Sequence, residues 1–167
     1  LLRIPPVYAE ARLISTEELA YIVEESSEGG MLDERELLYL ENVLDFQDRT
    51  VNQVMVPRTR METIPAQTNP REALEMVVSQ PHSRYPVFNE DRDDIIGVLH
   101  TKDLARYVAE HGFEDDITDE NETTVADLVR EPVFVPESLP LDDMLTRMRH
   151  DHIQVALVID EYGGIAG

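Results

Sequence analysis

The sequence predicts an α+β protein built from two copies of one small unit, and three observations support this. Ile64-Pro65 in the first copy is matched by Val135-Pro136 about 70 residues later, inside a longer shared pattern. Both copies alternate between helix-like and strand-like stretches in the same order. Neither copy is long enough to bury its apolar faces alone, so we expect the two to stack on each other.

Residues 1–48, which precede the repeats, predict an acidic segment of two short helices. Residues 15–18 and 33–36 each place a small polar residue three positions before a glutamate, which is the spacing of a capping box. Apolar residues at helical spacing follow both motifs, and residues 26–30 break the pattern between them. A helix pair this short needs a partner: the rest of this chain, a second copy of it, or a neighbouring membrane domain.

Residues 49–108 form the first copy, and local signals predict each of its elements. Asn69-Pro70 combines an N-cap with a proline at the first helical position. The turn-rich residues 89–94 separate two strand-like runs. The expected elements are a short helix ending at Pro57, an extended stretch at 61–65, a helix after Asn69, strands at 84–88 and 95–99, and a helix at 102–109.

The second copy, residues 124–167, follows an acidic stretch at 109–123 that predicts a mobile linker. The expected elements of this copy are a helix at 140–149, a strand at 155–159 and a hairpin turn at 161–164. The first copy continues past its second strand as far as Leu104, whereas the second copy ends at Gly167. We therefore expect the second unit to be truncated at its C-terminal side.

Composition narrows the function classes. The 14 Lys and Arg residues against 35 Asp and Glu residues give a net charge of −21, which argues against nucleic acid or anionic lipid as a general partner. The chain has no cysteine, so disulfides, thiolate metal sites and thiol nucleophiles are excluded. No apolar run approaches the roughly 18 residues that a membrane span needs.

We find no motif for catalysis or for metal binding. His150 and His152 flank Asp151, but residues two apart do not share a helix face. The acidic run at 115–122 lacks the central glycine and the closing glutamate of a calcium loop. Neither a phosphate-binding glycine loop nor a nucleophile elbow is present. The sequence therefore predicts a binding module with no catalytic and no metal-ligating residues.

Five short runs carry a resemblance to a known family: Val54-Met55-Val56-Pro57-Arg58, Ser83-Arg84-Tyr85-Pro86, Ile96-Gly97-Val98, Asp103-Leu104 and Val158-Ile159-Asp160-Glu161-Tyr162-Gly163-Gly164. With the order of elements, they resemble a tandem CBS-domain pair, or Bateman module, with a truncated second domain. The resemblance extends to the CorC/hemolysin C/cyclin M family of magnesium and cobalt efflux proteins.

This resemblance implies a regulatory module on the cytoplasmic face of the membrane, joined to the transmembrane domain of the same full-length protein. It also implies binding of an adenine nucleotide, with Mg-ATP favoured over AMP or ADP, and a homodimer formed through the CBS pair.

An adenine nucleotide needs an apolar slot for the base, a carboxylate for the ribose and positive charge for the phosphates. In CBS domains the ribose carboxylate ends a run that matches residues 97–103 here, except that His100 replaces a hydroxyl residue. The candidate nucleotide-binding residues are Val56, Pro57, Tyr85 and Pro86 for the base, Arg58 and Arg84 for the phosphates, Asp103 for the ribose, and Thr101 as the displaced hydroxyl.

Other interpretations of these residues stay open. Asp103 is also a candidate N-cap of the helix at 102–109, Arg84 a surface ion-pair partner and Tyr85 a core residue. The second copy of the ribose run would fall beyond Gly167, so a site that combines it with Arg58 and Tyr85 would be half complete. For the whole module, the alternatives are dimerisation without a ligand and direct sensing of divalent cations by the acidic surface.

Overall fold

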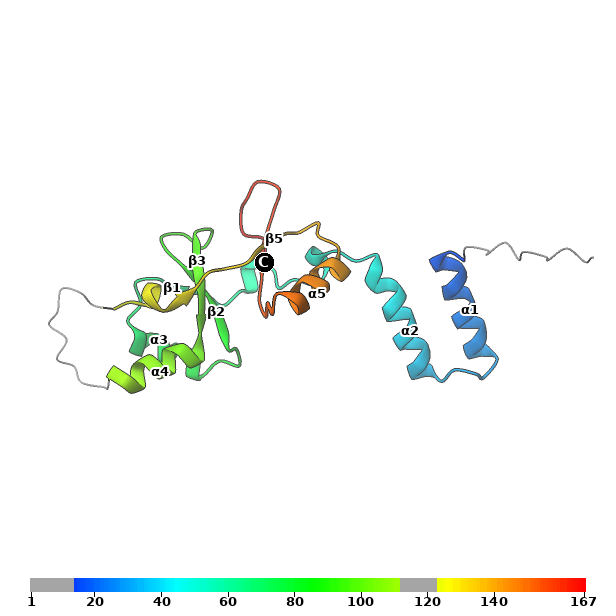
Figure 1. Cartoon of the computed structure of the whole chain (residues 1–167), viewed down its shortest axis with the longest axis horizontal. Helices are drawn as coiled ribbons and strands as arrows, with labels where there is room; N and C mark the ends of the chain where they lie inside the picture. Colours follow the sequence, from blue (N-terminus) through cyan, green and yellow to red (C-terminus); the bar gives the residue numbers. More distant parts are fainter. Residues whose placement is uncertain (1–13, 112–122) are drawn as a thin grey trace, which may run out of the picture. The chain divides into compact units, whose positions relative to one another are not determined.

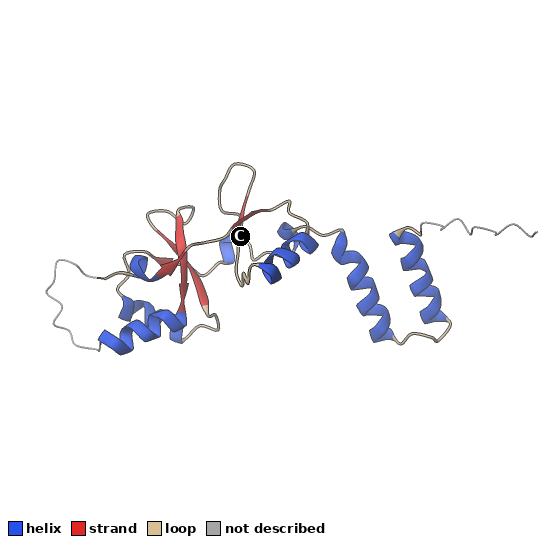
Figure 2. Ribbon diagram, in the orientation of Figure 1, coloured by secondary structure: helices blue, strands red, loops and turns tan. Residues whose placement is uncertain are grey.

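The computed structural model describes residues 14–111 and 123–167 and divides the chain into two compact units, Leu1–Arg49 and Thr50–Gly167 (Figure 1). The first unit holds the acidic segment, and the second holds both repeats. The expected α+β class is confirmed (Figure 2). No helix of the described residues is long and apolar enough to cross a membrane.

The first unit is a pair of capped helices, α1 (Thr16–Glu28) and α2 (Glu34–Gln47). Asp33 and Glu36 form the predicted capping box, with the Asp33 N–H donating to Glu36 Oε2 at 2.9 Å. Ser15 caps α1 by accepting the Glu18 N–H at 3.2 Å. Neither helix contains a buried residue, so residues 14–49 form no core of their own.

The first repeat supplies two helices and three strands to the second unit. Helices α3 (Pro70–Val78) and α4 (Thr101–His111) lie side by side against the sheet (Figure 1). The Asn69 side chain caps α3 as predicted, and Pro70 is its first residue. The strands are β1 (Ile64–Pro65), β2 (Arg84–Phe88) and β3 (Ile95–His100), and short 3₁₀ helices occupy Val51–Gln53 and Arg58–Arg60.

The second repeat contributes to two sheets. Its strand β4 (Val129–Arg130) pairs antiparallel with β3, which completes a four-stranded sheet in the order β1-β2-β3-β4. Strands β5 (Phe134–Pro136) and β6 (Leu157–Ile159) pair in parallel as a second sheet, beside helix α5 (Leu141–His150). A 3₁₀ helix, Val125–Leu128, leads into β4.

The two repeats exchange their first residues, which we call the lead segments (residues 51–56 and 125–130). The Val125 N–H donates to the Thr68 carbonyl at 3.0 Å, and the Val51 N–H donates to the Leu139 carbonyl at 2.9 Å. Val125 is buried in the core of the first repeat, and Val51 is buried in the core of the second. Each repeat therefore completes the other, as the duplication predicts.

Several predicted boundaries need correction. Helix α4 runs from Thr101 to His111, so residues 109–111 of the expected linker are its last turn. The rest of that linker, residues 112–122, lies outside the described residues. The strand expected at 155–159 is only Leu157–Ile159, and β4 was not predicted. The prediction of a strand at 84–88 is confirmed, as are the helices after Asn69 and Pro140.

Candidate functional site

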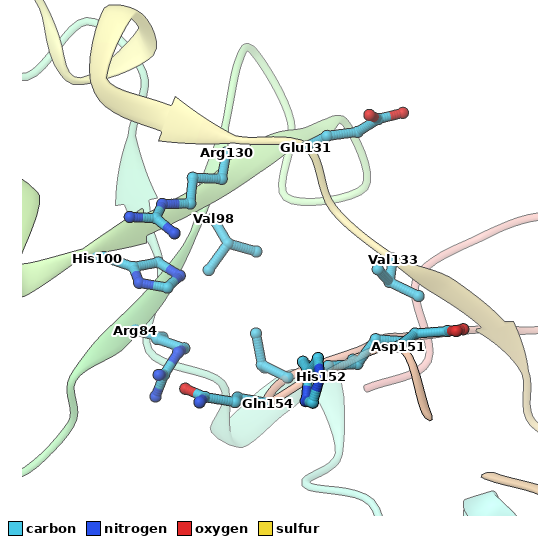
Figure 3. Close-up of a pocket in the computed structure, with 11 residues that line it drawn as sticks. Arg84, Val98, His100, Arg130, Glu131, Val133, Asp151, His152 and Gln154 are labelled. Carbon is cyan, nitrogen blue, oxygen red and sulfur yellow. The ribbon is translucent and has the colours of Figure 1, made fainter. Parts of the chain in front are cut away.

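A cleft of about 440 Å³ opens between the two repeats (Figure 3). One wall is a face of the four-stranded sheet and carries Arg84, Val98, His100 and Arg130. The opposite wall is the turn that follows α5, residues 151–155. Strand register explains the first wall, because Arg84 lies opposite His100 and Arg130 lies opposite Val98. Residues directly opposite on paired strands share a face of the sheet, and so do residues two apart on one strand.

Three cationic or titratable groups therefore gather on three adjacent strands: Arg84 on β2, His100 on β3 and Arg130 on β4. Among the residues that the structure describes, Arg84 forms no ion pair. Burial and the nearby Arg130 and Arg84 lower the pKa of His100, although Asp103 opposes this shift. Such a cluster attracts an anion, and it stands out in a chain of net charge −21.

Asp103 lies next to this cluster and links the repeats. Its Oδ2 accepts from Arg130 Nε at 3.0 Å and from Arg130 Nη2 at 2.6 Å, and its Oδ1 faces Arg106 Nη1 at 3.4 Å. The Asp103 side chain is 20% exposed, so a ligand can still reach it. Because α4 begins at Thr101, Asp103 is the third helical residue and not the N-cap.

Thr101, the first residue of α4, bonds to the residue that precedes β2. Its N–H donates to the Ser83 carbonyl at 3.1 Å, and its hydroxyl donates to the same oxygen at 3.4 Å. Ser83 directly precedes Arg84, so these hydrogen bonds fix the backbone at the start of β2, where Arg84 lies. The predicted role of Thr101 as a ligand-binding hydroxyl is therefore in competition with a structural one.

Tyr85 and Pro86 are buried and do not line the cleft. Tyr85 is 3% exposed and belongs to the core of the first repeat, because alternation along β2 turns it away from the face that carries Arg84. It lines a separate pocket of about 390 Å³ together with Met61 and Thr63. Burial, and then the charge of Glu62, raise the pKa of Tyr85.

Val56, Pro57 and Arg58 lie apart from the cleft as well. Val56 ends the lead segment of the first repeat, and Pro57 and Arg58 follow it directly. The Arg58 N–H donates to the Ala166 carbonyl at 2.9 Å. The Arg58 side chain forms an exposed ion pair with Asp93. Of the predicted residues, Arg84 lines the cleft, Thr101 bonds to Ser83 next to it, and Asp103 bonds to Arg130 of the same wall. The other predicted residues lie elsewhere.

The cleft also contains residues that the sequence analysis did not select. Val98, Val133, Ile153 and Val155 supply apolar surface. Arg130 could have been found from the duplication, because it occupies in the second lead segment the place that Val56 has in the first. His152 had no such signal. Its backbone is left-handed, with φ of 56°, and its ring lies opposite Arg84 and His100 (Figure 3).

The acidic residues near the cleft have other partners or point outward. Asp151 Oδ1 lies 2.6 Å from His150 Nδ1, and its Oδ2 lies 3.8 Å from Arg147 Nε. The carboxylates of Glu131 and Asp151 extend away from the centre of the cleft (Figure 3). Within residues 14–111 and 123–167, no group of three or more His, Asp or Glu side chains is placed to hold a metal ion.

Fold and cleft together define the class: a duplicated α+β module that can hold a small anionic ligand between its repeats. A family model described as "CBS domain" matches residues 51–110 and 125–167. The chain therefore belongs to the CBS-domain family, as a tandem pair of the type found in CNNM/CorC proteins.

Curated relatives agree with this assignment. The chain is 39% identical over 152 residues to a UPF0053 protein of Mycobacterium tuberculosis, a match that covers 90% of this chain and 33% of the relative. It is 34% identical over 151 residues to the magnesium and cobalt efflux protein CorC of Escherichia coli K12, which covers 90% of this chain and 49% of CorC. The chain thus spans between one third and one half of these relatives.

Solved structures match over most of the chain. The CBS domain of a bacterial CNNM/CorC family Mg²⁺ transporter is 32% identical with a TM-score of 0.78, covering 93% of this chain and 90% of that one. A structure of such a domain in complex with ATP is 30% identical with a TM-score of 0.66, covering 77% and 85%. A CBS-domain pair with bound AMP from Klebsiella pneumoniae is 28% identical with a TM-score of 0.57, covering 71% and 88%.

Proposed function

We propose that this chain is a non-catalytic regulatory module that binds an adenine nucleotide, preferably Mg-ATP, and thereby controls a membrane magnesium or cobalt transporter. The observation that carries the proposal is the cluster of Arg84, His100 and Arg130 beside Asp103 in one cleft of an otherwise acidic chain. The cleft spans both repeats, so a ligand there acts on their relative arrangement. CBS domains are binding modules, and the matched family indicates no catalytic activity.

Each part of a nucleotide finds a chemically suited partner in this cleft. Arg84 and Arg130 are forked donors suited to phosphate. Asp103 can accept from the ribose hydroxyls once Arg130 turns toward the phosphates, because those two side chains are now bonded to each other. Val98, Ile153 and Val155 offer apolar surface to the base. Mg²⁺ would enter on the phosphates, since the described residues form no metal site.

The relatives support the wider biological context of this proposal. CBS domains related to this chain have been solved with ATP and with AMP, and CorC is named as a magnesium and cobalt efflux protein. We therefore place the module at the cytoplasmic face of a membrane, joined to the transmembrane domain of its own full-length protein. We also propose that two copies associate through their CBS pairs. The net charge of −21 makes nucleic acid an unsuitable partner.

Isothermal titration of ATP, ADP and AMP, each with and without Mg²⁺, tests the proposal. We expect saturable binding that is selective for adenine over guanine nucleotides and strongest for ATP with Mg²⁺. Arg84→Ala should weaken it at least tenfold, because Arg84 lines the cleft and its loss removes one charged hydrogen bond to phosphate. Arg60→Ala is the matched control, because Arg60 is exposed and does not line the cleft.

Other outcomes point to the alternatives. Loss of binding in Arg58→Ala but not in Arg84→Ala would indicate that the nucleotide binds near Arg58, on the other side of the CBS pair. If no nucleotide binds and ultracentrifugation shows concentration-dependent association, dimerisation without a ligand is favoured. A response to Mg²⁺ alone that vanishes in high salt would favour sensing by the acidic surface.

A further inference from the structure

His100 occupies the centre of the cationic wall, and its position follows from the sheet. It is the last residue of β3 and lies directly opposite Arg84 of β2. Arg130 of β4 lies opposite Val98, two residues before His100 and on the same face. The imidazole is therefore flanked by a guanidinium on each neighbouring strand, and Figure 3 shows the three side chains along one wall.

The charged groups around His100 disfavour its protonated form while the cleft holds no anion. Burial, Arg130 and Arg84 all lower the pKa of His100. Of the carboxylates, Asp103 on α4 opposes this effect but is already bonded to Arg130. Asp151 across the cleft pairs with His150, and Glu131 extends outward. The remaining titratable group on the opposite wall is His152.

We propose that His100 couples nucleotide binding to proton uptake, so that this module binds its nucleotide more tightly as the pH falls from 8 to 6. This inference rests on the proposed function, because the coupling requires phosphate in this cleft. A phosphate held by Arg84 and Arg130 offsets their positive charge at His100 and adds negative charge beside it. Its pKa then rises, and the imidazole gains a proton and a hydrogen bond to a phosphate oxygen.

Linkage fixes the size of the effect. Uptake of one full proton makes the affinity change by at most about tenfold for each pH unit, and partial uptake gives proportionally less. The coupling also gives His100 a function at a position where the CBS ribose run has a hydroxyl residue. The occupancy of the module by nucleotide would then depend on the pH as well as on the nucleotide concentration.

Titration of Mg-ATP at pH 7 in two buffers of different ionisation enthalpy measures the protons taken up on binding. We expect uptake by the wild-type chain and a clear reduction in His100→Asn, with a flatter dependence of affinity on pH between 6 and 8. Subtracting the variant from the wild type removes the titration of the nucleotide's own phosphates. His111→Asn at the far end of α4 is the matched control and should behave as the wild type.

A second variant, His100→Thr, restores the hydroxyl of the CBS run and serves if His100→Asn fails to fold. Equal proton uptake in the wild type and either variant would overturn the role of His100 while leaving nucleotide binding intact. If only His152→Asn loses proton uptake, the role of His100 is overturned as well, and His152 is the group that takes up the proton. Absence of Mg-ATP binding at every pH would overturn both this inference and the proposed function.

Discussion

Gly97 shows how a single residue sets the contact between the repeats. A Cβ added there would lie 2.4 Å from Val129 Cγ2 and 2.9 Å from the Arg130 carbonyl oxygen, so β4 could not keep its place against β3. We expect Gly97→Ala to lower the free energy of unfolding by roughly 1–3 kcal/mol, the usual cost of overpacking. Thermal unfolding monitored by circular dichroism measures it.

The matched control is Gly29→Ala, at a helix end where the nearest atom to a new Cβ is 3.4 Å away. Its backbone is right-handed, with φ of −72°, so alanine fits there without strain. This change should leave the stability of the second unit unaltered. Equal melting temperatures for both variants would show that the lead segment does not press against β3 as described.

His152 presents the opposite case, a non-glycine residue in a left-handed backbone conformation. It follows α5 with φ of 56°, while the Ile153 N–H closes the helix end on the Met148 carbonyl at 3.0 Å. Glycine usually takes this place in a helix terminus, because other residues lose about 1 kcal/mol there. We expect His152→Gly to raise the free energy of unfolding by about that amount, measured by urea denaturation.

His152→Ala is the control, because alanine removes the imidazole but keeps the Cβ atom that strains the left-handed backbone. It should bring no gain in stability. If alanine stabilises as much as glycine, the imidazole itself, and not the left-handed backbone, is the destabilising feature.

The lowered pKa of His100 makes stability depend on pH in a defined direction. Because the native state holds this proton less tightly than the unfolded state, protonation favours unfolding. The His100 contribution should therefore be complete above the ordinary histidine pKa of 6.5 and be lost as the pH falls from there through the lower pKa of the folded state. Urea denaturation of the nucleotide-free chain from pH 8 to 5 measures it. His100→Asn should lose this component, and an unchanged pH profile would contradict the account.

At the scale of elements, the exchanged lead segments predict that neither repeat folds alone. A fragment of residues 50–111 lacks Val125 and β4, and a fragment of residues 123–167 lacks Val51. We expect each to be largely unfolded by circular dichroism and the two to assemble when mixed. A fragment of residues 50–130, which carries Val125 and β4, is the control and should fold. Independent folding of the 50–111 fragment would contradict the reciprocal core.

The sequence predicted the elements that local chemistry determines. Asn69-Pro70 gave the start of α3, the Asp33 capping box gave α2, and the run at 84–88 was β2 without correction. It missed β4, since a strand of two residues carries no periodic signal and forms only because β3 is beside it. Local signals fix helix ends and long strands, whereas short strands depend on tertiary pairing.

The candidate site was predicted in part for the same reason. Arg84 and Asp103 were selected by chemistry and by resemblance. The structure places Arg84 on the wall of the cleft and bonds Asp103 to Arg130, which lines it. Arg130 was missed because its importance comes from a bond to Asp103, 27 positions away in the sequence. Tyr85 was predicted at the base because it is apolar and stands beside a proline, but alternation along β2 turns it into the core of the first repeat, away from the face that carries Arg84.

At the scale of the whole molecule, the net charge of −21 makes stability depend on salt, and this dependence separates nucleotide binding from surface sensing of cations. The negative charges repel one another in the folded state. Because dissolved ions screen this repulsion, NaCl should raise the melting temperature. On the nucleotide-binding proposal, MgCl₂ at the same ionic strength should add little to this, because Mg²⁺ then acts only together with the nucleotide. The measurement is thermal unfolding in both salts, with and without ATP.

Mg²⁺ and ATP together should stabilise the chain further, because a ligand that binds only the native state contributes about 2.7 kcal/mol at one hundred times its dissociation constant. In Arg84→Ala the same mixture should add at most about 1.4 kcal/mol, because binding that is at least tenfold weaker leaves the ligand at no more than ten times its dissociation constant. A large effect of MgCl₂ alone that persists in Arg84→Ala would instead assign ion sensing to the surface. The cleft would then be dispensable for the response to magnesium.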